Sequence, residues 1–525
     1  MRSGTAIAAP GDDASDGALV WGLTSRQVAM LAGILIVTIA VYLPSLRNGW
    51  VYDDRIQILT SYGLHSWSGI GKSFFNDSWW FRDPHKLPAS AYYRPLQATW
   101  FGVNYMILGS QNPAAWHLEK LVLQLVAVVV CFRLVQLLTE NTPIALLAAA
   151  IFALIPANAE SVAWNSAIGE PLSAIFEMGA LCCVINRKSD SPRRLVLASV
   201  LYVGALLSHE TAVLFWIVIA AYSFLIEDKR FGESMRLAAP FVLLAIGYLG
   251  ARLYALGPSF LGMPYIVAPA AEFGWENVPP PHGLHDLLLT APVALLAYVG
   301  VLVAPGIAGP SHDVEWIVRA TPITFVSAVT LLVLVATASA LIWRSQDRRL
   351  YLFCAVWSLI TIAPVMNLKA LAVLVQDRYL YAPSFGWSLA LAVATIRVAA
   401  AGPRARKAIA GGMAMLLAAY AITVVKVESY WRDDFTFFTR CVALAPRNVN
   451  YLRELVNELN QKGDFATATE ELRDAVNRDP DNVYLHLKLA DEYGMMQRPS
   501  DFEAEILKAR ALRAGTRPDS AAPSP

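Results

Sequence analysis

The sequence is poor in charged residues. Only 16% of its 525 residues are charged, against about 25% in an ordinary soluble domain, and 56% are apolar. Of the 42 basic and 41 acidic residues, 30 lie within 427–525, which leaves 53 in the first 426 positions. The formal net charge of +1 provides no basic face, so no nucleic-acid partner is expected. This distribution predicts a membrane domain followed by a smaller water-soluble one.

Cysteine is scarce as well. The five cysteines form no Cys-x-x-Cys pair and mostly lie inside apolar runs, which excludes a zinc knuckle and a disulfide framework. No cluster has metal-ligand spacing, so no metal or other cofactor is expected. Residues 1–27 lack the basic segment and cleavage site of a signal peptide and predict a disordered tail. A second disordered tail, rich in Pro, Ala and Ser, is expected at 516–525.

Long apolar runs fill residues 28–427, which we interpret as an all-α, polytopic membrane domain. About 20 apolar residues cross a bilayer core, and on that basis we predict eleven spans. The predicted spans are 28–46, 118–138, 143–157, 171–186, 195–208, 211–226, 237–256, 321–343, 350–366, 383–400 and 408–427.

Lysine and arginine in the short loops set the predicted orientation. Basic clusters near 187–194, 229–236, 344–349 and 404–407 should be cytoplasmic, and so should the amino terminus. The loop 47–115 and the carboxy terminus should then lie outside. A span at 284–304 would break this alternation, so that segment is expected to be re-entrant or to lie along the outer surface. The compact loops suggest a bacterial inner membrane, with the outer parts in the periplasm.

The hydrophobic period changes in the predicted soluble domain, 428–515. Pro446 and Pro480 are 34 residues apart and open similar phrases, and Gly463 lies between them at a predicted turn. A period of 34 with this arrangement is the signature of tetratricopeptide repeats. Two repeats and a half are marginal alone, because each repeat is stabilised only by its neighbours. The array is therefore expected to pack on the membrane domain or on a partner.

Ionisable residues lie at the predicted outer ends of several spans, where they are costly and often functional. Asp53 and Asp54 follow the first span; the alternative is that one of them caps the next helix. Arg94 opens an interfacial segment, where it could hold a lipid phosphate or simply extend its charge toward the headgroups.

Three further outer loops carry acidic or basic groups. Glu160 and Glu170 lie in one of them, and His209 and Glu210 in the next, where Glu210 could be only a helix cap. In the last, Asp377, Arg378 and Tyr379 enter a span, and the alternative there is an Asp–Arg pair that ties the loop to the helix. Several such groups on one face favour a site over separate structural roles.

Taken in order, these segments resemble the GT-C glycosyltransferases of the protein O-mannosyltransferase type. Within that class the chain is similar to the transmembrane and tetratricopeptide-repeat mannosyltransferases and to their bacterial relatives. The resemblance covers 28 to about 510. The residues that carry it are Tyr52-Asp53-Asp54, Tyr93-Arg94-Pro95-Leu96, Pro156-x-Asn158-x-Glu160, Ser208-His209-Glu210 and Asp377-Arg378-Tyr379-Leu380-Tyr381-x-Pro383-Ser384.

The sequence departs from the family pattern at three places. Asn158 and Ile155 stand where the family has the two histidines of His-Pro-x-His-Thr-Glu. Ile168 precedes Gly169-Glu170 in place of a Gly-Arg-x-Asp/Glu pattern, which removes its arginine. His209 replaces the lysine of a Ser-Lys-Glu motif.

The resemblance implies a hexosyltransferase that takes a mannose-like sugar from a polyprenyl-phosphate donor in the membrane. The sugar would pass to an acceptor hydroxyl on the outer face with inversion, and the repeats would dock an acceptor protein or glycan. Asp53 would be the general base, with Asp54 and Glu160 as helpers, and Arg378 and Arg94 would bind the donor phosphate. Glu170, His209, Glu210, Asp377 and Tyr379 would support them, and no divalent metal is expected.

Two other classes of protein compete with an enzyme. A membrane scaffold would use the repeats to gather partners, and the missing histidines would then mark lost chemistry. A lipid-linked sugar transporter would need ionisable groups near the middle of its spans and access from both faces. Because the acidic residues cluster toward one face, transport is the least favoured.

Overall fold

The protein is described here from a computed structural model that covers residues 22–81, 90–185, 192–257, 260, 283–366 and 374–514. Within these ranges it is an all-α polytopic membrane protein with no strand, as the sequence predicts. Eight helices are long and apolar enough to cross a membrane, or nine if one bent pair is counted. They are α1 (Ser25–Tyr42), α4 (Pro113–Thr139), α7 (Gly169–Ile185) with the turn before it from Asn165, α10 (Phe231–Leu256), α11 (Leu284–Val303), α12 (Pro322–Arg344), α13 (Arg348–Ile362) with the turn after it to Val365, and α15 (Pro403–Ser429).

All eleven predicted spans are helical where the structure describes them, but four are short. The short ones have at most 17 residues, against the roughly 20 that cross a bilayer core, so the number of spans stays a prediction. They are α5 (Thr142–Leu154), α8 (Pro192–Ser208), α9 (Phe215–Ala221) with its flanking turns, and α14 (Pro383–Ala399). Helix α5 continues past Pro156 into α6 (Ala159–Ala163) with a bend of 53°.

Helix α1 begins inside the segment 1–27 that the sequence predicts to be a tail. Helix α1 begins at Ser25, because Thr24 caps it and Gln27 completes a capping box. Residues 25–27 were therefore wrongly assigned to the tail. Positions 1–21 and the predicted tail at 516–525 lie outside the described residues.

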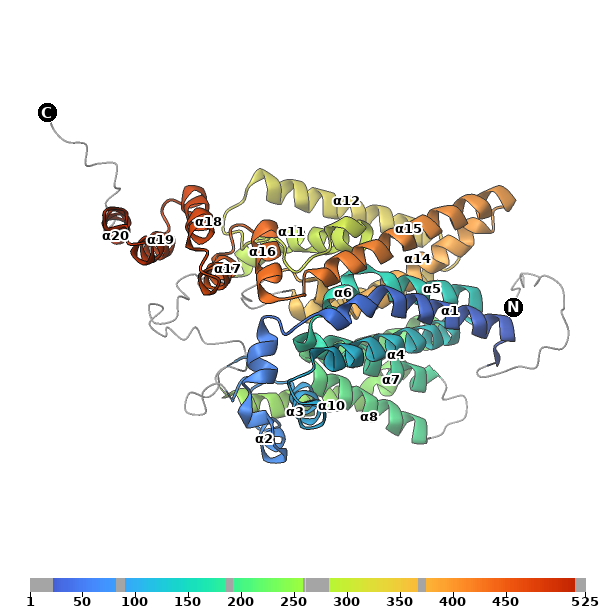
Figure 1. Cartoon of the computed structure of the whole chain (residues 1–525). Helices are drawn as coiled ribbons and strands as arrows, with labels where there is room; N and C mark the ends of the chain where they lie inside the picture. The colour runs from blue at the N-terminus through green and yellow to red at the C-terminus, as the bar shows by residue number, and fades with distance from the viewer. Residues whose placement is uncertain are drawn as a thin grey trace.

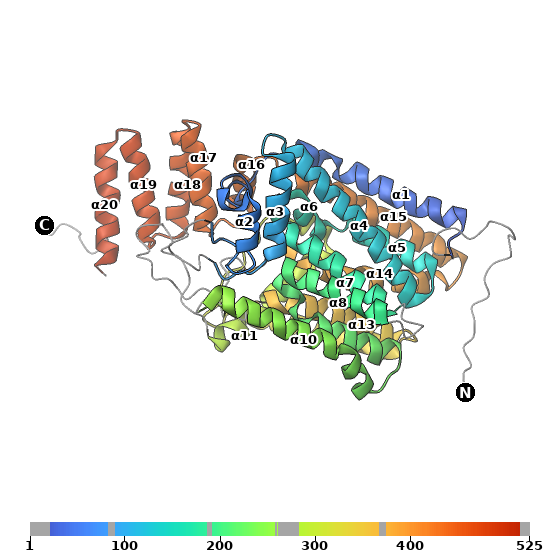
Figure 2. The ribbon, with the colours of Figure 1, turned by 90° about the horizontal axis from the view of Figure 1, so that it is seen from below.

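The centre of the bundle is the alanine-rich helix α5, which packs against α4 and α14. Ala145, Ala148 and Ala149 are completely buried, and such small side chains let neighbouring backbones approach closely. Figures 1 and 2 show the axes of α1, α4, α5 and α15 roughly aligned along the bundle, although the chain does not run the same way in all of them. The long axis of the bundle therefore defines two ends.

Two of the predicted cytoplasmic turns, those near 229–236 and 344–349, meet at one of these ends. Arg349, after α12, pairs with Asp228, before α10, at 2.8 Å, and Arg397 at the end of α14 pairs with Asp347 at 2.7 Å. The amino terminus of α1 lies toward this same end, far from the repeats (Figure 1). The structure thus brings these two basic turns together at one end; which compartment that end meets stays a prediction.

The segment predicted not to span, 284–304, forms helix α11, and the chain after it returns alongside the helix. The Ile317 backbone N–H donates to the Thr290 hydroxyl at 3.0 Å, so residues after α11 run back beside it. Leu302 lies near the carboxyl end of α11, and its carbonyl accepts a hydrogen bond from the Tyr420 hydroxyl of α15 at 2.9 Å. This bond holds that end of α11 against α15. A re-entrant segment requires such a return, although α11 alone has the length of a span.

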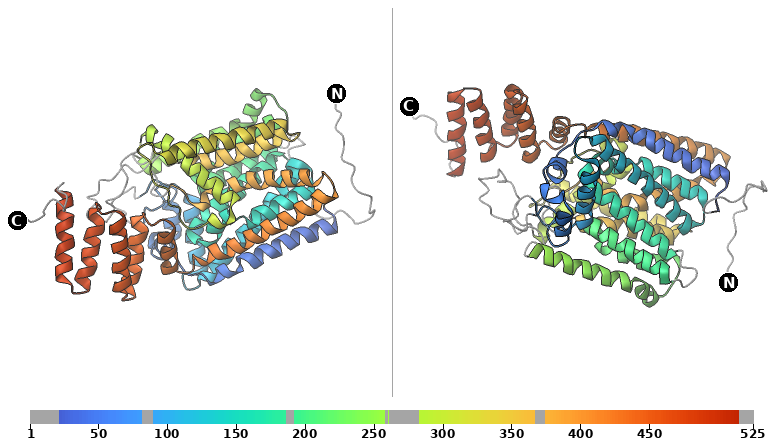
Figure 3. Two further views of the ribbon diagram at one scale, coloured as in Figure 1. Left: turned by 90° about the horizontal axis from the view of Figure 1, so that it is seen from above. Right: turned by 60° about the horizontal axis from the view of Figure 1, so that its bottom comes forward.

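The carboxy-terminal helices repeat with the predicted period. Helices α17 (Val449–Gln461) and α19 (Val483–Met495) start 34 residues apart, as do α18 (Phe465–Arg478) and α20 (Pro499–Arg513). Figure 2 shows α17–α20 as a row of helices that projects from the bundle. Helix α16 (Asp434–Leu444) precedes them as the predicted half repeat and joins the row to the bundle, as both views in Figure 3 show.

Candidate active site

The site is built around a strained turn after the first span. Tyr52 has a φ of +55°, a backbone conformation that bulky residues rarely adopt. Its N–H donates to Asp434 of α16 at 2.7 Å, and its ring stacks on Trp164 and Phe437. Strained residues of this kind persist only where their surroundings hold them, and they cluster at functional sites.

This turn sends the two adjacent acids into different surroundings. Asp54 is buried, and one of its carboxylate oxygens accepts hydrogen bonds from the Ser166 N–H at 2.8 Å and hydroxyl at 2.6 Å. Burial raises the pKa of Asp54 to about 6, although the Ser166 hydrogen bonds act in the opposite direction. Asp54 makes no side-chain cap to its helix, so the capping alternative is wrong for it. Asp53 is only partly buried.

Arg378 forms the ionic centre of the site. Its Nη1 atom lies 2.6 Å from Glu160, whose other oxygen accepts the Arg378 N–H at 3.1 Å, and its Nε atom lies 3.3 Å from Glu170. The guanidinium also lies 4.8 Å from the centre of the Trp164 ring. Both carboxylates are almost fully buried, which is tolerable only because a cation is shared between them.

The alternative of an Asp377–Arg378 pair that ties the loop to the helix is wrong, because these two side chains do not contact each other. Asp377 is buried and accepts the Gly309 N–H and the His312 ring N–H, each at 2.7 Å. Burial lowers the pKa of His312, but Asp377 outweighs this and holds it above its usual value. The returning chain after α11 is thereby fixed beside Arg378.

Arg94 is also engaged by a carboxylate. Its Nε and Nη2 atoms form a forked pair with the two oxygens of Glu210, each at 2.7 Å, and its side chain is 16% exposed. Burial would raise the pKa of Glu210, but Arg94 holds it well below its usual range. Arg94 is therefore not simply extended toward the lipid headgroups, and Glu210 is more than a helix cap.

His209 joins the two arginine clusters. Its Nε2 atom lies 3.7 Å from Glu170, and its Nδ1 atom is 2.9 Å from the Thr211 hydroxyl. Burial lowers the pKa of His209 to about 4, and Arg94 adds to that effect. Gly169 permits this approach, because a Cβ there would lie 2.9 Å from the Ser208 carbonyl.

The candidate residues share one neighbourhood. Burial raises the pKa of the Tyr92 phenol, and Arg94, Glu210, Arg378 and Asp53 all act on it electrostatically. A small cavity of about 20 Å³ adjoins Tyr92 and Arg94 and is lined by Trp79 and Phe81. Tyr379 presents its ring to Arg378 at 5.0 Å. All ten predicted site residues therefore lie at the end of the bundle that faces the repeats.

Four contacts at this site escaped sequence reasoning. They involve Trp164 under Arg378, Ser166 on Asp54, His312 on Asp377 and Asp434 on Tyr52. Of these residues, Trp164 has the clearest signal in the sequence, because it is an aromatic residue four positions after Glu160 in a predicted outer loop. The other three carry no local signal, because each meets its partner across 65 to 382 positions of chain. Among the described residues, no three His, Cys, Asp or Glu side chains form a group that could hold a metal ion.

The fold and site define a class: a multi-pass, all-helical membrane protein with an ionic cluster where its acidic loops meet a helical-repeat array. No family model matches the chain. It is similar to curated proteins named protein O-mannosyl-transferase. It is 22% identical to Tmtc3 of Drosophila melanogaster over 93% of its own length and 59% of the relative.

Two shorter similarities support the first. The chain is 30% identical to Tmtc1 of Drosophila melanogaster over 36% of its length and 22% of that relative. It is 27% identical to human TMTC3 over 31% of its length and 17% of that relative. The chain thus spans less than two thirds of the length of these relatives. They are animal proteins, so the expected bacterial membrane stays a prediction.

Proposed function

We propose that the chain is an integral-membrane glycosyltransferase that moves a mannose-like sugar from a polyprenyl-phosphate donor to an acceptor hydroxyl. The main support is Arg378, a nearly buried cation at the membrane-domain end that carries the acidic loops, with Asp53 in the same neighbourhood. The names of the relatives support transfer of mannose to a protein acceptor. We place the site and the repeats on the outer, non-cytoplasmic face.

Asp53 is the proposed general base. It takes the proton of the acceptor hydroxyl while the hydroxyl oxygen forms a bond to the anomeric carbon of the donor sugar. The bond from that carbon to the phosphate oxygen breaks, and its electron pair leaves with the polyprenyl phosphate. A single displacement of this kind inverts the anomeric centre. Partial burial suits the role, because Asp53 keeps access to an acceptor.

The arginines are proposed to receive the negative charge of the leaving phosphate. The carboxylate contacts of Arg378 use Nε and Nη1, and those of Arg94 use Nε and Nη2. In the described part of the chain this leaves Nη2 of Arg378 and Nη1 of Arg94 for phosphate oxygens. Cations fixed in advance by protein contacts stabilise developing charge without reorganising during the reaction. The proposed step therefore uses protein cations and needs no divalent metal.

The protein contacts refine the roles predicted for two acids. Asp54 and Glu160 were expected to touch acceptor or sugar hydroxyls, but protein groups already contact their oxygens. Ser166 donates to Oδ1 of Asp54, the Val51 N–H and the Asn165 amide lie 3.4 Å from its Oδ2, and Arg378 contacts both oxygens of Glu160. We propose instead that Glu160 positions Arg378 and that Asp54 holds the Ser166 turn. Glu170, His209, Glu210 and Tyr379 keep their supporting role, since each contacts a candidate arginine or another of these residues. Asp377 keeps one as well, since it precedes Arg378 and holds the loop of His312 beside it.

A donor panel tests the proposal. Purified protein is incubated with labelled polyprenyl-phosphate mannose, glucose and galactose in the presence of a serine- and threonine-rich acceptor peptide, and release of polyprenyl phosphate and glycosylation of the peptide are measured. We expect turnover with at least one donor, and a loss of about 10²- to 10⁴-fold in Asp53→Asn, the range typical of a missing general base. Asp313→Asn, on a solvent-facing loop, is the matched control. Absence of turnover with every donor would favour the scaffold alternative, in which the repeats only gather partners.

A further inference from the structure

The repeat array contains a pocket that the proposed reaction does not use. It lies between α17, α18 and α19 and has a volume of about 120 Å³. A single ordered water needs only about 10–15 Å³ of such space, so the pocket has room for a side chain of several atoms. Its wall is mixed, and its apolar part includes Leu452, Val456, Leu472 and Met495.

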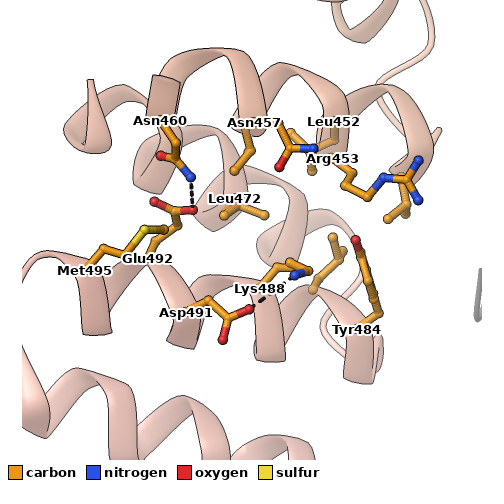
Figure 4. A pocket seen from close by; sticks show the side chains of 13 residues that line it. Leu452, Arg453, Asn457, Asn460, Leu472, Tyr484, Lys488, Asp491, Glu492 and Met495 are labelled. Atoms are coloured by element: carbon orange, nitrogen blue, oxygen red, sulfur yellow. Dashed lines mark hydrogen bonds and ion pairs between the residues drawn. The ribbon is translucent and has the colours of Figure 1, made fainter. Parts of the chain in front are cut away.

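One end of the pocket presents buried acceptors that lack donors. Glu492 is 2% exposed, and its Oε1 atom accepts the Asn460 Nδ2–H at 2.7 Å. Its Oε2 atom and the Asn460 Oδ1 atom are buried, and neither has a hydrogen-bond partner among the described residues. Figure 4 shows Asn460 and Glu492 facing each other, with Met495 beside them. A buried carboxylate without a cation is costly, so this end is suited to a positively charged donor.

The cations near the pocket do not fill this need. Lys488 pairs with Asp491 at 3.2 Å (Figure 4), and Arg453 donates to Glu454 at 3.0 Å. Residues 449–513 contain 9 basic and 13 acidic residues, a formal charge of −4. The charge of the whole repeat segment therefore favours a basic partner, as does the end of the pocket.

We propose that this pocket binds a lysine side chain of a partner protein. The four methylenes of the lysine lie along the apolar part of the wall, and its ammonium donates to the Oε2 atom of Glu492 and the Oδ1 atom of Asn460. An arginine fits less well, because its planar fork prefers both oxygens of a carboxylate and Asn460 already occupies one of them. If the proposed transferase function holds, this contact selects acceptor segments that carry a lysine.

Peptide binding to the full-length protein in detergent tests this inference. The probe is a fluorescein-labelled peptide of eleven residues, made of glycine, serine and alanine around one central lysine. Matched peptides carry acetyl-lysine or arginine at that position. By fluorescence anisotropy we expect the lysine peptide to bind at least about tenfold more tightly than the acetylated one, because acetylation removes the charge. Equal binding of these two peptides, or no binding of the lysine peptide at millimolar concentration, would overturn the proposal.

Two variants locate the contact. Glu492→Gln keeps the shape and the Asn460 contact but removes the charge, so it should lose the preference for lysine over acetyl-lysine. Glu470→Gln makes the same chemical change at an exposed position of α18 and should bind like the parent. Circular dichroism checks that Glu492→Gln is folded. If the variant does not fold, the comparison of the lysine and acetyl-lysine peptides on the parent protein still tests the proposal. Donor turnover is measured separately, so failure of lysine binding is distinguishable from failure of the transferase proposal.

Discussion

At the residue scale, Arg378 shows how one side chain can join several parts of the molecule. It contacts a carboxylate from α6 and one from α7, and it lies against the Trp164 ring between them. A planar guanidinium can make these contacts at once and still face a phosphate, whereas a lysine ammonium is a single point of charge. The identity of this residue therefore matters beyond its charge.

We expect Arg378→Lys to lower kcat/KM for the lipid donor by about 10²-fold, a typical cost of losing one preorganised charge contact. The donor assay measures this effect. Arg447→Lys, at an exposed ion pair, should stay within about twofold because such pairs contribute little. Full activity in Arg378→Lys would remove the phosphate role from this residue.

The pH dependence of stability provides a test at Asp54. Its pKa is about 6 in the folded protein and 3.8 in the reference state, so the folded protein binds its proton more tightly than the unfolded chain does. This contribution to stability is fully present below pH 4 and is lost as pH rises through 6. Its size is at most about 3 kcal/mol, from about 1.4 kcal/mol per pKa unit.

Asp54→Asn mimics the protonated carboxyl and should remove that dependence. Acidification from pH 7 to pH 4 should therefore raise Tm less in the variant than in the parent, by a few degrees. Thermal unfolding of both proteins in detergent, followed by intrinsic fluorescence, measures the difference. Identical pH slopes would show that Asp54 does not titrate in this window.

At the scale of elements, helix α16 couples the repeats to the candidate site. Asp434 accepts the N–H of the strained Tyr52 and pairs with Arg55, while Trp431 stacks on Trp164 at 5.2 Å. The half repeat predicted from the period of 34 thus packs on the membrane domain, as its marginal length requires. Through Asp434, α16 holds the turn that carries Asp53.

We expect Asp434→Ala to lower transferase activity at least about tenfold and to reduce stability by about 1.5–3 kcal/mol, since a hydrogen bond to a charged group is lost. Activity and thermal unfolding are measured on the same preparation. Asp481→Ala, an exposed change elsewhere in the repeats, should alter neither. If Asp434→Ala were stable and fully active, α16 would be only a connector.

At the scale of the whole molecule, the two ends of the bundle differ in charge and in what they carry. Basic turns cross-linked by Asp228 and Asp347 occupy one end, and the acidic site with the repeats occupies the other. Lysine and arginine concentrate in cytoplasmic loops. The site end should therefore face away from the cytoplasm.

Labelling of single introduced cysteines tests this orientation. In sealed vesicles with the native outer face exposed, a membrane-impermeant maleimide should label Ser68→Cys directly and Gln346→Cys only after permeabilisation. Both positions are exposed, one near the site and one in a basic turn. The parent protein, with its five native cysteines, provides the background. The reverse labelling pattern would invert the orientation and place the site in the cytoplasm.

Much of the architecture follows from local sequence pattern. The apolar runs and the prolines that open α4 and α14 act on their own segments, so the helices were predictable, although the Thr24 cap starts α1 before the predicted position 28. The period of 34 likewise reports a local unit repeated along the chain. Span length is visible in the sequence too: the predicted spans at 143–157, 195–208, 211–226 and 383–400 are themselves shorter than about 20 residues, and α5, α8, α9 and α14 are correspondingly short.

The sequence by itself determined that the protein is a helical membrane protein, where its repeats start, and which acids and arginines are suspects. Only the tertiary structure decided that Asp54 turns inward to Ser166 while Asp53 stays partly exposed, and that Asp377 pairs with His312 and not with Arg378. Helix formation depends on residues three or four positions apart. Ion pairs and buried hydrogen bonds depend on which distant segments the packing brings together.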